Sequence, residues 1–269
     1  MISLPSFFKP QHILWLSWTS VLLFLAACVQ LQESGRSVFL VTTPEQEASM
    51  GAESFAQLKA GGKISGDPVT NSQVQRVAQN LIRQVNVPNA NWEVVVFDDP
   101  TPNAFALPGG KIGVHTGILP LTQNDAGLAA VLGHELAHVT LRHGGQRFSQ
   151  QSGIMLGYSA LGIALANEEY KTRQLWQTAA GIGSQVFLTL PFSRSHEYEA
   201  DRYGMTYMAR AGYDPQEAIN FWKRMEAASN QPGSKPPEWL STHPADSNRI
   251  KQLQDLLPQA QAEYQRARL

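Results

Sequence analysis

Two histidines four residues apart, with a glutamate directly after the first, lie in an almost wholly apolar stretch, AAVLGHELAHVTLRHGG (129–145). On an α-helix, positions i and i+4 lie about 40° apart in projection and one turn apart along the axis, so the imidazoles of His134 and His138 can converge on one ion. Glu135 lies about 100° round from His134, where its carboxylate can reach a water on the metal without binding the metal itself. The stretch therefore predicts a helix with a zinc site and a general base beside it.

An ordinary buried helix with hydrogen-bonded histidines is the alternative. Burying an isolated carboxylate among alanine, valine and leucine side chains is costly unless it has a partner, and this cost disfavours the alternative for Glu135. In the catalytic interpretation, zinc with three protein ligands and an open fourth position lowers the pKa of its water to about 7. Glu135 then accepts that proton and passes it to the leaving amine.

A third protein ligand has to come from another part of the chain. The metzincin layout requires glycine three residues after the second histidine and histidine three residues beyond that. Leu141 and Gly144 occupy those positions, so this layout is excluded. His143 comes five residues after His138 and points to a different helix face; we expect a helix-end residue near the negative end of the dipole, not a ligand.

A glutamate on a second helix is the other known arrangement, with an aspartate one turn later to orient a ligating histidine. Glu197 is followed four residues on by Asp201, and this spacing places both carboxylates on one helix face. Four other candidates have no acid at that distance and are set aside: Glu168, Glu169, His196 and Glu199. Glu197 is therefore the predicted third ligand.

The N-terminal region is typical of an export signal. An apolar run from about residue 13 to 27 has the length of a signal-peptide core and is short for a membrane-spanning helix. It ends in LAAC (25–28), which resembles a bacterial lipobox. We therefore expect residues 1–27 to be removed and Cys28 to be acylated, which anchors the protein firmly if several chains are attached. The alternative is a plain secretory signal followed by a chance cysteine.

Further constraints come from the single cysteine and from the charge. A lone cysteine excludes internal disulfides. Val29, rather than an aspartate, follows Cys28, which by the sorting pattern of enterobacterial lipoproteins favours the outer membrane, with the domain in the periplasm. The formal net charge is −1 and no basic run occurs, so nucleic acid is not an expected partner.

The remaining patterns divide the chain into a lipidated tether, 28–42, and one domain, 43–269. Thr43 and Pro44 are typical of a helix start, and a helical apolar stripe follows in 72–86. A strand is expected in 92–99 and two more around the Pro-Gly-Gly turn of 103–117. Helices are then expected from Asn124 or Asp125, in 193–212, in 214–228 and in 242–257. Residues 148–191 suggest two packed helices, with a membrane-dipping hairpin as the minority alternative.

Four segments resemble the landmarks of the HtpX/Oma/CAAX-prenyl-protease family of zinc metallopeptidases, in the family's order. They are NAFALPGGKIGVHTGIL, GHELAHVTLRHG, SRSHEYEADRYG and THPADSNRI. The chain is most similar to the small lipoprotein branch, without the multi-pass helices or the TPR extension. This resemblance implies an α+β, mostly helical fold: a zincin-like metallopeptidase domain with a small β-sheet beside the HExxH helix.

The resemblance also implies the roles of the site residues. One zinc ion per chain is bound by His134, His138 and Glu197, with Glu135 as the base and Asp201 orienting a ligating histidine. The histidine matching His243 can approach the zinc in relatives, as a fourth ligand in a closed state or as a donor to the transition state, and Arg249 lies close by. A helix cap near Pro244 is the alternative role for His243.

An extended substrate would add as a strand to the sheet edge at Asn103, Ala104 and Phe105, through main-chain hydrogen bonds. Asn103 is equally compatible with a plain turn after Pro102. The expected function is that of a membrane-anchored zinc endopeptidase that cuts misfolded or loosely folded envelope proteins. A chaperone-like or binding lipoprotein with a closed, mainly structural zinc site is the alternative.

Overall fold

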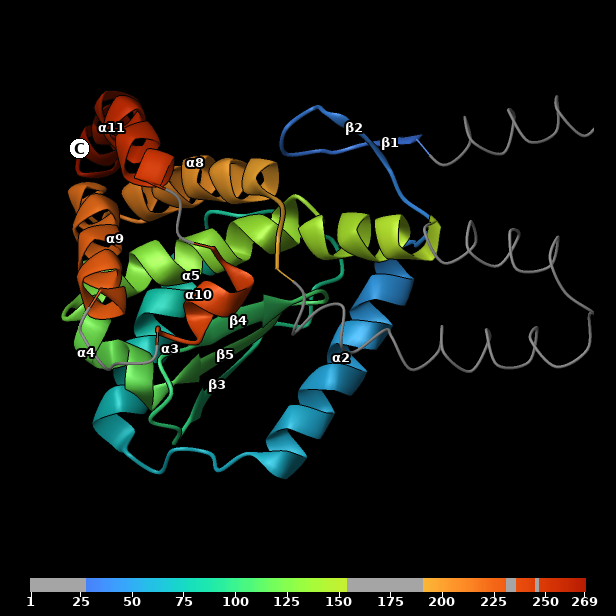
Figure 1. The fold of residues 1–269 in the computed structure, drawn as a ribbon, viewed down its shortest axis with the longest axis horizontal. Helices are drawn as coiled ribbons and strands as arrows, with labels where there is room; N and C mark the ends of the chain where they lie inside the picture. The colour runs from blue at the N-terminus through green and yellow to red at the C-terminus, as the bar shows by residue number, and fades with distance from the viewer. Residues whose placement is uncertain (1–27, 154–190, 231–235, 245–246) are drawn as a thin grey trace, which may run out of the picture.

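The computed structural model describes residues 28–153, 191–230, 236–244 and 247–269 (Figure 1). Within these ranges, no helix is both long and apolar enough to cross a bilayer. The expected signal peptide (1–27) and most of the segment expected to form two packed helices or a membrane hairpin (154–190) lie outside the described residues.

The first two long helices both begin after a side-chain N-cap, and the sequence predicts the start of the first of them. Helix α2 (Pro44–Gly61) has Thr43 as its N-cap, in a reciprocal capping box with Gln46. Helix α3 (Pro68–Ile82) is capped by Asp67, whose side chain accepts from the N–H groups of Val69 and Thr70. Of the predicted apolar stripe, Val74, Val77 and Leu81 are fully buried in the core, whereas Ile82 and Val85 are partly buried against it.

A three-stranded sheet carries the strands expected around the Pro-Gly-Gly turn. Strands β3 (Glu93–Phe97), β4 (Ala104–Leu107) and β5 (Lys111–His115) lie in the order β3-β5-β4. β3 and β5 are parallel, and β4 and β5 form an antiparallel hairpin. Gly109 and Gly110 turn the hairpin with φ of 79° and 86°, values that favour glycine. β4 is therefore an outer strand of this sheet, at the edge opposite β3.

Helix α5 (Asp125–Thr140) carries the HExxH stretch and forms the centre of the molecule. Asn124 caps it by accepting from the N–H of Gly127, and all residues from 127 to 139 are buried. A 3-10 turn (Thr116–Ile118) and the short helix α4 (Leu119–Thr122) lead into it from β5. The helix ends earlier than the sequence suggests, because the chain turns at Leu141 and Arg142, with φ of 53° at Arg142, before helical structure resumes at residue 143.

The described C-terminal residues form four helices, two of which pack closely against α5 (Figure 1). They are α8 (Arg194–Arg210), α9 (Gln216–Ser229), the one-turn helix α10 (Trp239–Thr242) and α11 (Ser247–Ala267). The helix expected in 242–257 thus begins later and continues further, and α10, which no pattern predicts, precedes it. The confirmed fold is α+β and mostly helical, with a small sheet beside α5.

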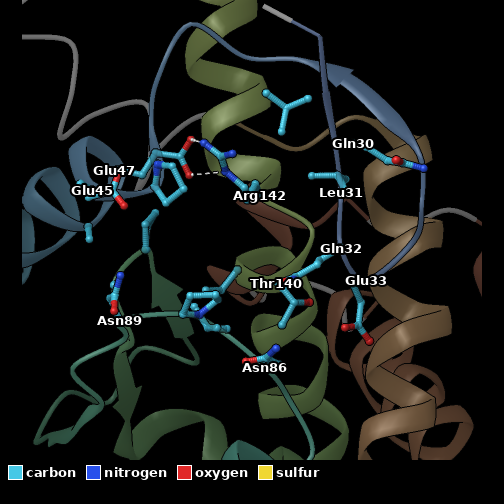
Figure 2. A pocket seen from close by; sticks show the side chains of 18 residues that line it. Gln30, Leu31, Gln32, Glu33, Glu45, Glu47, Asn86, Asn89, Thr140 and Arg142 are labelled. Carbon is cyan, nitrogen blue, oxygen red and sulfur yellow. Dashed lines mark hydrogen bonds and ion pairs between the residues drawn. The ribbon is translucent and has the colours of Figure 1, made fainter.

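Residues 28–42, expected to be a tether, contain two short antiparallel strands, β1 (Cys28–Gln30) and β2 (Ser37–Phe39). Leu31, Val38 and Leu40 are buried together. Figure 2 shows this segment beside the ends of α2 and α5, where Glu47 pairs with Arg142 across 2.7 Å. Part of the segment therefore packs as an element of the fold.

Candidate active site

Four buried side chains point their metal-binding atoms at one another. They are His134 and His138 of α5, Glu197 of α8 and His243, the residue after α10, and one donor atom from each lies within 4.8 Å of all the others. Each residue is only 2–3% exposed. The structure thus brings together residues from three segments of the chain, and the first and last of them, His134 and His243, are 109 residues apart in the sequence.

The arrangement of these donors fits zinc. The Nε2 atoms of His134 and His138 face each other across 3.0 Å, close to the edge of about 3.3 Å between two nitrogens on a tetrahedral zinc ion. Oxygens of Glu197 lie 3.4 Å from each of these two nitrogens. Two imidazoles and a carboxylate are a donor set that zinc favours in hydrolytic enzymes.

His243 closes the fourth side of the cluster. Its Nδ1 lies 3.2 Å from Nε2 of His134 and 3.1 Å from Oε1 of Glu197. The ring stacks on Trp239, with centroids 4.7 Å apart. The side chain therefore lies among the metal-binding atoms rather than at the start of α11, which begins only at Ser247.

Glu135 lies beside the cluster with one carboxylate oxygen held by two neighbours. Trp239 Nε1 donates to its Oε1 across 2.7 Å, and His243 Nε2 is 3.3 Å from the same oxygen. The sequence argument required a partner for this buried carboxylate, and Trp239 is that partner. Sequence reasoning missed it because no pattern predicts α10, which carries the indole.

An acid and an arginine stand behind His134. Oδ1 of Asp201 lies 2.9 Å from Nδ1 of His134, on the side of the ring away from the cluster. Arg249 donates to both oxygens of Asp201 across 2.7 Å, and its Nη1 is 2.6 Å from Glu197. Its guanidinium also lies over the Trp222 ring, 3.7 Å from the centroid. The i, i+4 acids of α8 thus face α5, as their spacing predicts.

The close contact between α5 and α8 depends on two glycines. A Cβ on Gly133 would lie 2.7 Å from the carbonyl oxygen of Gly204, and one on Gly204 would lie 2.6 Å from the backbone nitrogen of His134. No larger residue fits at this crossing without moving a helix backbone. The glycine pair therefore lets the carboxylates of α8 reach the histidines of α5.

Burial and opposite charges act against each other on the pKa values of the site. Burial lowers the pKa of His134, but hydrogen bonds to Asp201 and Glu197 outweigh it and raise the pKa to about 9. Burial raises the pKa of Glu197, but the charges of His243 and Arg249 hold it well below its usual range. Burial dominates at His138 and lowers its pKa. Without zinc, the site therefore holds a proton on His134 at neutral pH.

His143, Glu199 and His196, which the sequence argument sets aside as ligands, lie outside the cluster of metal-binding atoms. Two of them are nevertheless connected to the cluster through His138. Nδ1 of His143 lies 3.0 Å from Nδ1 of His138, and Nε2 of His143 lies 3.2 Å from Oε2 of Glu199. His143 is fully buried. The expectation that it points away from His138 is wrong, because α5 ends at Thr140 and the turn at Arg142 redirects the chain.

The predicted substrate strand lies at the sheet edge nearest α5. Ala104 and Phe105 begin β4, and the carbonyl of Asn103 accepts from the N–H of His115, which extends the ladder by one residue. Trp239 donates its backbone N–H to the carbonyl of Pro102. The indole that holds Glu135 is therefore tied directly to the residue before this strand segment.

The comparisons with known proteins agree on one protein family. The model of Peptidase family M48 matches residues 68–257. The mitochondrial metalloendopeptidase OMA1 of Schizosaccharomyces pombe is 40% identical over 194 residues, which cover 71% of this chain and 54% of that protein. The beta-barrel assembly-enhancing protease of Yersinia pestis is 29% identical over 225 residues, covering 82% of this chain and 46% of that protein.

The chain thus spans about half the length of the curated relatives that it matches. The matched region contains every residue of the cluster, together with Glu135, Asp201 and Arg249. The chain belongs to Peptidase family M48, a family of zinc metallopeptidases.

Proposed function

We propose that this protein is a membrane-anchored zinc endopeptidase that cuts misfolded or loosely folded proteins of a bacterial envelope. The observation that carries the catalytic part is the buried cluster of two imidazoles and a carboxylate, with a second carboxylate, that of Glu135, directly beside it. The Trp239 N–H offsets part of the cost of burying this carboxylate, and a hydrolytic zinc site needs a base at this position.

In this proposal His134, His138 and Glu197 hold one zinc ion. The ion, when bound, supplies a Lewis acid that lowers the pKa of water to about 7. Glu135 accepts a proton at its carboxylate and returns it to the leaving amine. The carboxylate of Asp201, 2.9 Å from Nδ1 of His134, is placed to take up the proton on that nitrogen and so to leave Nε2 of the ring as a metal-binding lone pair.

Two further residues have proposed roles near the reacting atoms. His243 is proposed to donate a hydrogen bond to a negatively charged transition state. Arg249 is committed to Asp201 and Glu197 in this structure, so its proposed role is to hold those carboxylates in place. His243 has to withdraw from the cluster before it can donate to a substrate.

The outer strand β4 supports the substrate part of the proposal. A substrate that adds along Asn103, Ala104 and Phe105 through backbone hydrogen bonds is recognised by extended conformation rather than by sequence. Loosely folded chains offer such segments, whereas the strands of folded proteins are already paired. An unfolded casein is therefore a suitable test substrate.

The proposed anchor is a lipid on Cys28, which places the domain on the periplasmic face of the outer membrane. Cys28 is exposed and lies at the start of β1, so its thiol is accessible from outside the fold. Labelled palmitate should be incorporated into the wild-type protein and not into Cys28→Ala. A wild-type protein that carries no label and fractionates as a free periplasmic protein would refute the anchor while leaving the peptidase intact.

The Glu135→Gln variant tests the catalytic proposal. Glutamine keeps an oxygen for the Trp239 N–H, so the site geometry is preserved while the base is lost. We expect one zinc ion per chain in both proteins and casein cleavage in the wild type only. Cleavage by Glu135→Gln at the wild-type rate would overturn the mechanism.

A second candidate function follows from the position of His243. Its ring fills the fourth side of the cluster and contacts Glu135, an arrangement that suits a closed, mainly structural zinc site in a chaperone-like or binding lipoprotein. His243→Ala separates the possibilities. Faster casein cleavage indicates that His243 blocks the site, slower cleavage indicates a donor, and no cleavage by either protein with zinc still bound favours the structural site.

A further inference from the structure

The two proposed ligand histidines of α5 are supported differently on the sides that face away from the cluster. His134 meets a carboxylate directly, at Asp201. His138 instead meets a second imidazole, that of His143, whose other nitrogen meets the carboxylate of Glu199. Glu199 in turn pairs with Arg36, which lies in the segment between β1 and β2. A chain of contacts thus runs from the N-terminal strands to Nδ1 of His138, on the side of the ring that faces away from the cluster.

The hydrogen positions along this chain follow from its two ends. The Glu199 carboxylate can only accept, so Nε2 of His143 donates to it. Nδ1 of the same neutral ring is then an acceptor, and Nδ1 of His138 has to donate to it across 3.0 Å. The remaining nitrogen of His138, Nε2, is left with a free lone pair and faces His134 at 3.0 Å. This is the tautomer that binds zinc through Nε2.

The outer end of the chain is fixed by an arginine. Arg36 donates to both oxygens of Glu199, at 3.3 Å from Nε and 2.8 Å from Nη2. The same guanidinium reaches Gln146, beyond the turn that ends α5. His143 is fully buried and stacks on His196, with ring centroids 4.3 Å apart. Its ring orientation is therefore set by packing on its face and by hydrogen bonds at both nitrogens.

We propose that Arg36, Glu199 and His143 form a positioning chain that fixes the tautomer and ring orientation of His138, and that strands β1 and β2 thereby contribute to the affinity of the zinc site. This inference rests on the proposed zinc ligands. It assigns His143 and Glu199 a function toward the metal without making them ligands. It also makes the segment next to the proposed anchor a part of the site.

The test measures zinc affinity, by competition with a chelator, and the visible spectrum of the cobalt-substituted protein. His143→Leu removes the acceptor for His138 and should weaken zinc binding by about 10- to 100-fold, the loss typical of an orienting partner. His143→Asn places an amide oxygen near the position of Nδ1 and should recover most of that loss. The cobalt spectrum of His143→Leu should differ from that of the wild type more than the spectrum of His143→Asn does.

The outer members of the chain are tested with a matched control. Glu199→Ala should weaken zinc binding less than His143→Leu, and Arg36→Ala less again, because each acts one step further from His138. Arg76→Ala is the control, since Arg76 also pairs with a carboxylate, that of Asp125 at the start of α5, across 2.7 Å. An exposed pair of this kind should leave zinc affinity unchanged within about twofold.

The outcomes separate this inference from the proposed function. A wild-type protein that binds no zinc contradicts the zinc site itself. A wild-type protein that binds zinc, with His143→Leu of equal affinity and spectrum, overturns the positioning chain alone. Equal losses in His143→Leu and His143→Asn would also overturn it, because packing rather than the hydrogen bond would then be responsible. If His143→Leu proves unfolded by circular dichroism, Glu199→Ala against Arg76→Ala decides the question.

Discussion

Replacing Gly204 by alanine should damage the zinc site more than it damages the fold. The added Cβ would lie 2.6 Å from the backbone nitrogen of His134 and 2.8 Å from the carbonyl carbon of Gly133. These are helix backbone atoms, so no side chain can rotate away to make room. The strain has to be relieved by separating α8 from α5.

The size of the separation follows from the contact distances. Ordinary contacts of a Cβ atom begin at 3.4 Å, so the helices have to move apart by about 0.8 Å. Metal–ligand distances tolerate only about 0.2 Å, and a misplacement of about 1 Å can cost about 100-fold in rate. Overpacking costs about 1–3 kcal/mol of stability, but alanine recovers about 1 kcal/mol of helix propensity.

We therefore expect Gly204→Ala to lose about 2 kcal/mol of stability at most, while its kcat/KM on casein falls by about 100-fold. Urea unfolding of the zinc-free protein measures the first quantity, and initial rates measure the second. Gly61→Ala is the matched control: Gly61 is the last residue of α2, nothing lies within 4 Å of its added Cβ, and both quantities should hold or improve slightly. A Gly204→Ala protein with wild-type zinc affinity and kcat/KM would refute the reasoning.

Three other predictions concern the buried charges. Trp239→Phe removes the donor to the Glu135 carboxylate and should lower the free energy of unfolding by about 1.5–3 kcal/mol in urea titrations. Arg249→Met leaves two buried carboxylates without their cation and should cost the zinc-free protein about 3–5 kcal/mol; zinc should raise the Tm of this variant more than that of the wild type. Folding raises the pKa of His134 to about 9, so protonation of this side chain stabilises the zinc-free protein. This contribution to the free energy of unfolding is fully present below about pH 6.5 and is lost as the pH rises through 9. Zinc binding at pH 7 should accordingly release about one proton per chain, measured by calorimetry in buffers of different ionisation enthalpy.

Residue spacing predicted the parts of the site that lie within single helices. His134 and His138 share a face of α5, and Glu197 and Asp201 share a face of α8, because both pairs are separated by one helical turn. The strands and the turn at Gly109 and Gly110 were predicted from similarly local patterns. Each of these features depends on residues that are neighbours along one element.

The residues that the sequence could not place depend on where elements end and how they pack. His143 was assigned to the wrong face because its position was extrapolated along a straight helix, whereas α5 stops at Thr140. Trp239 reaches Glu135 from α10, a one-turn helix without a recognisable periodicity. Phe192 stacks on His138 at 3.9 Å from a segment that carries no motif. A sequence pattern contains no information on such contacts between distant elements.

The central claim, that His134, His138 and Glu197 hold one zinc ion on which hydrolysis depends, is tested most directly by a zinc titration. Chelator-treated wild-type protein is titrated with zinc while casein cleavage is followed. Activity should be absent at first, rise linearly and reach a plateau at one zinc ion per chain, and Glu197→Gln should show no such break. Full cleavage before any zinc is added, or the same break in Glu197→Gln, would contradict the account.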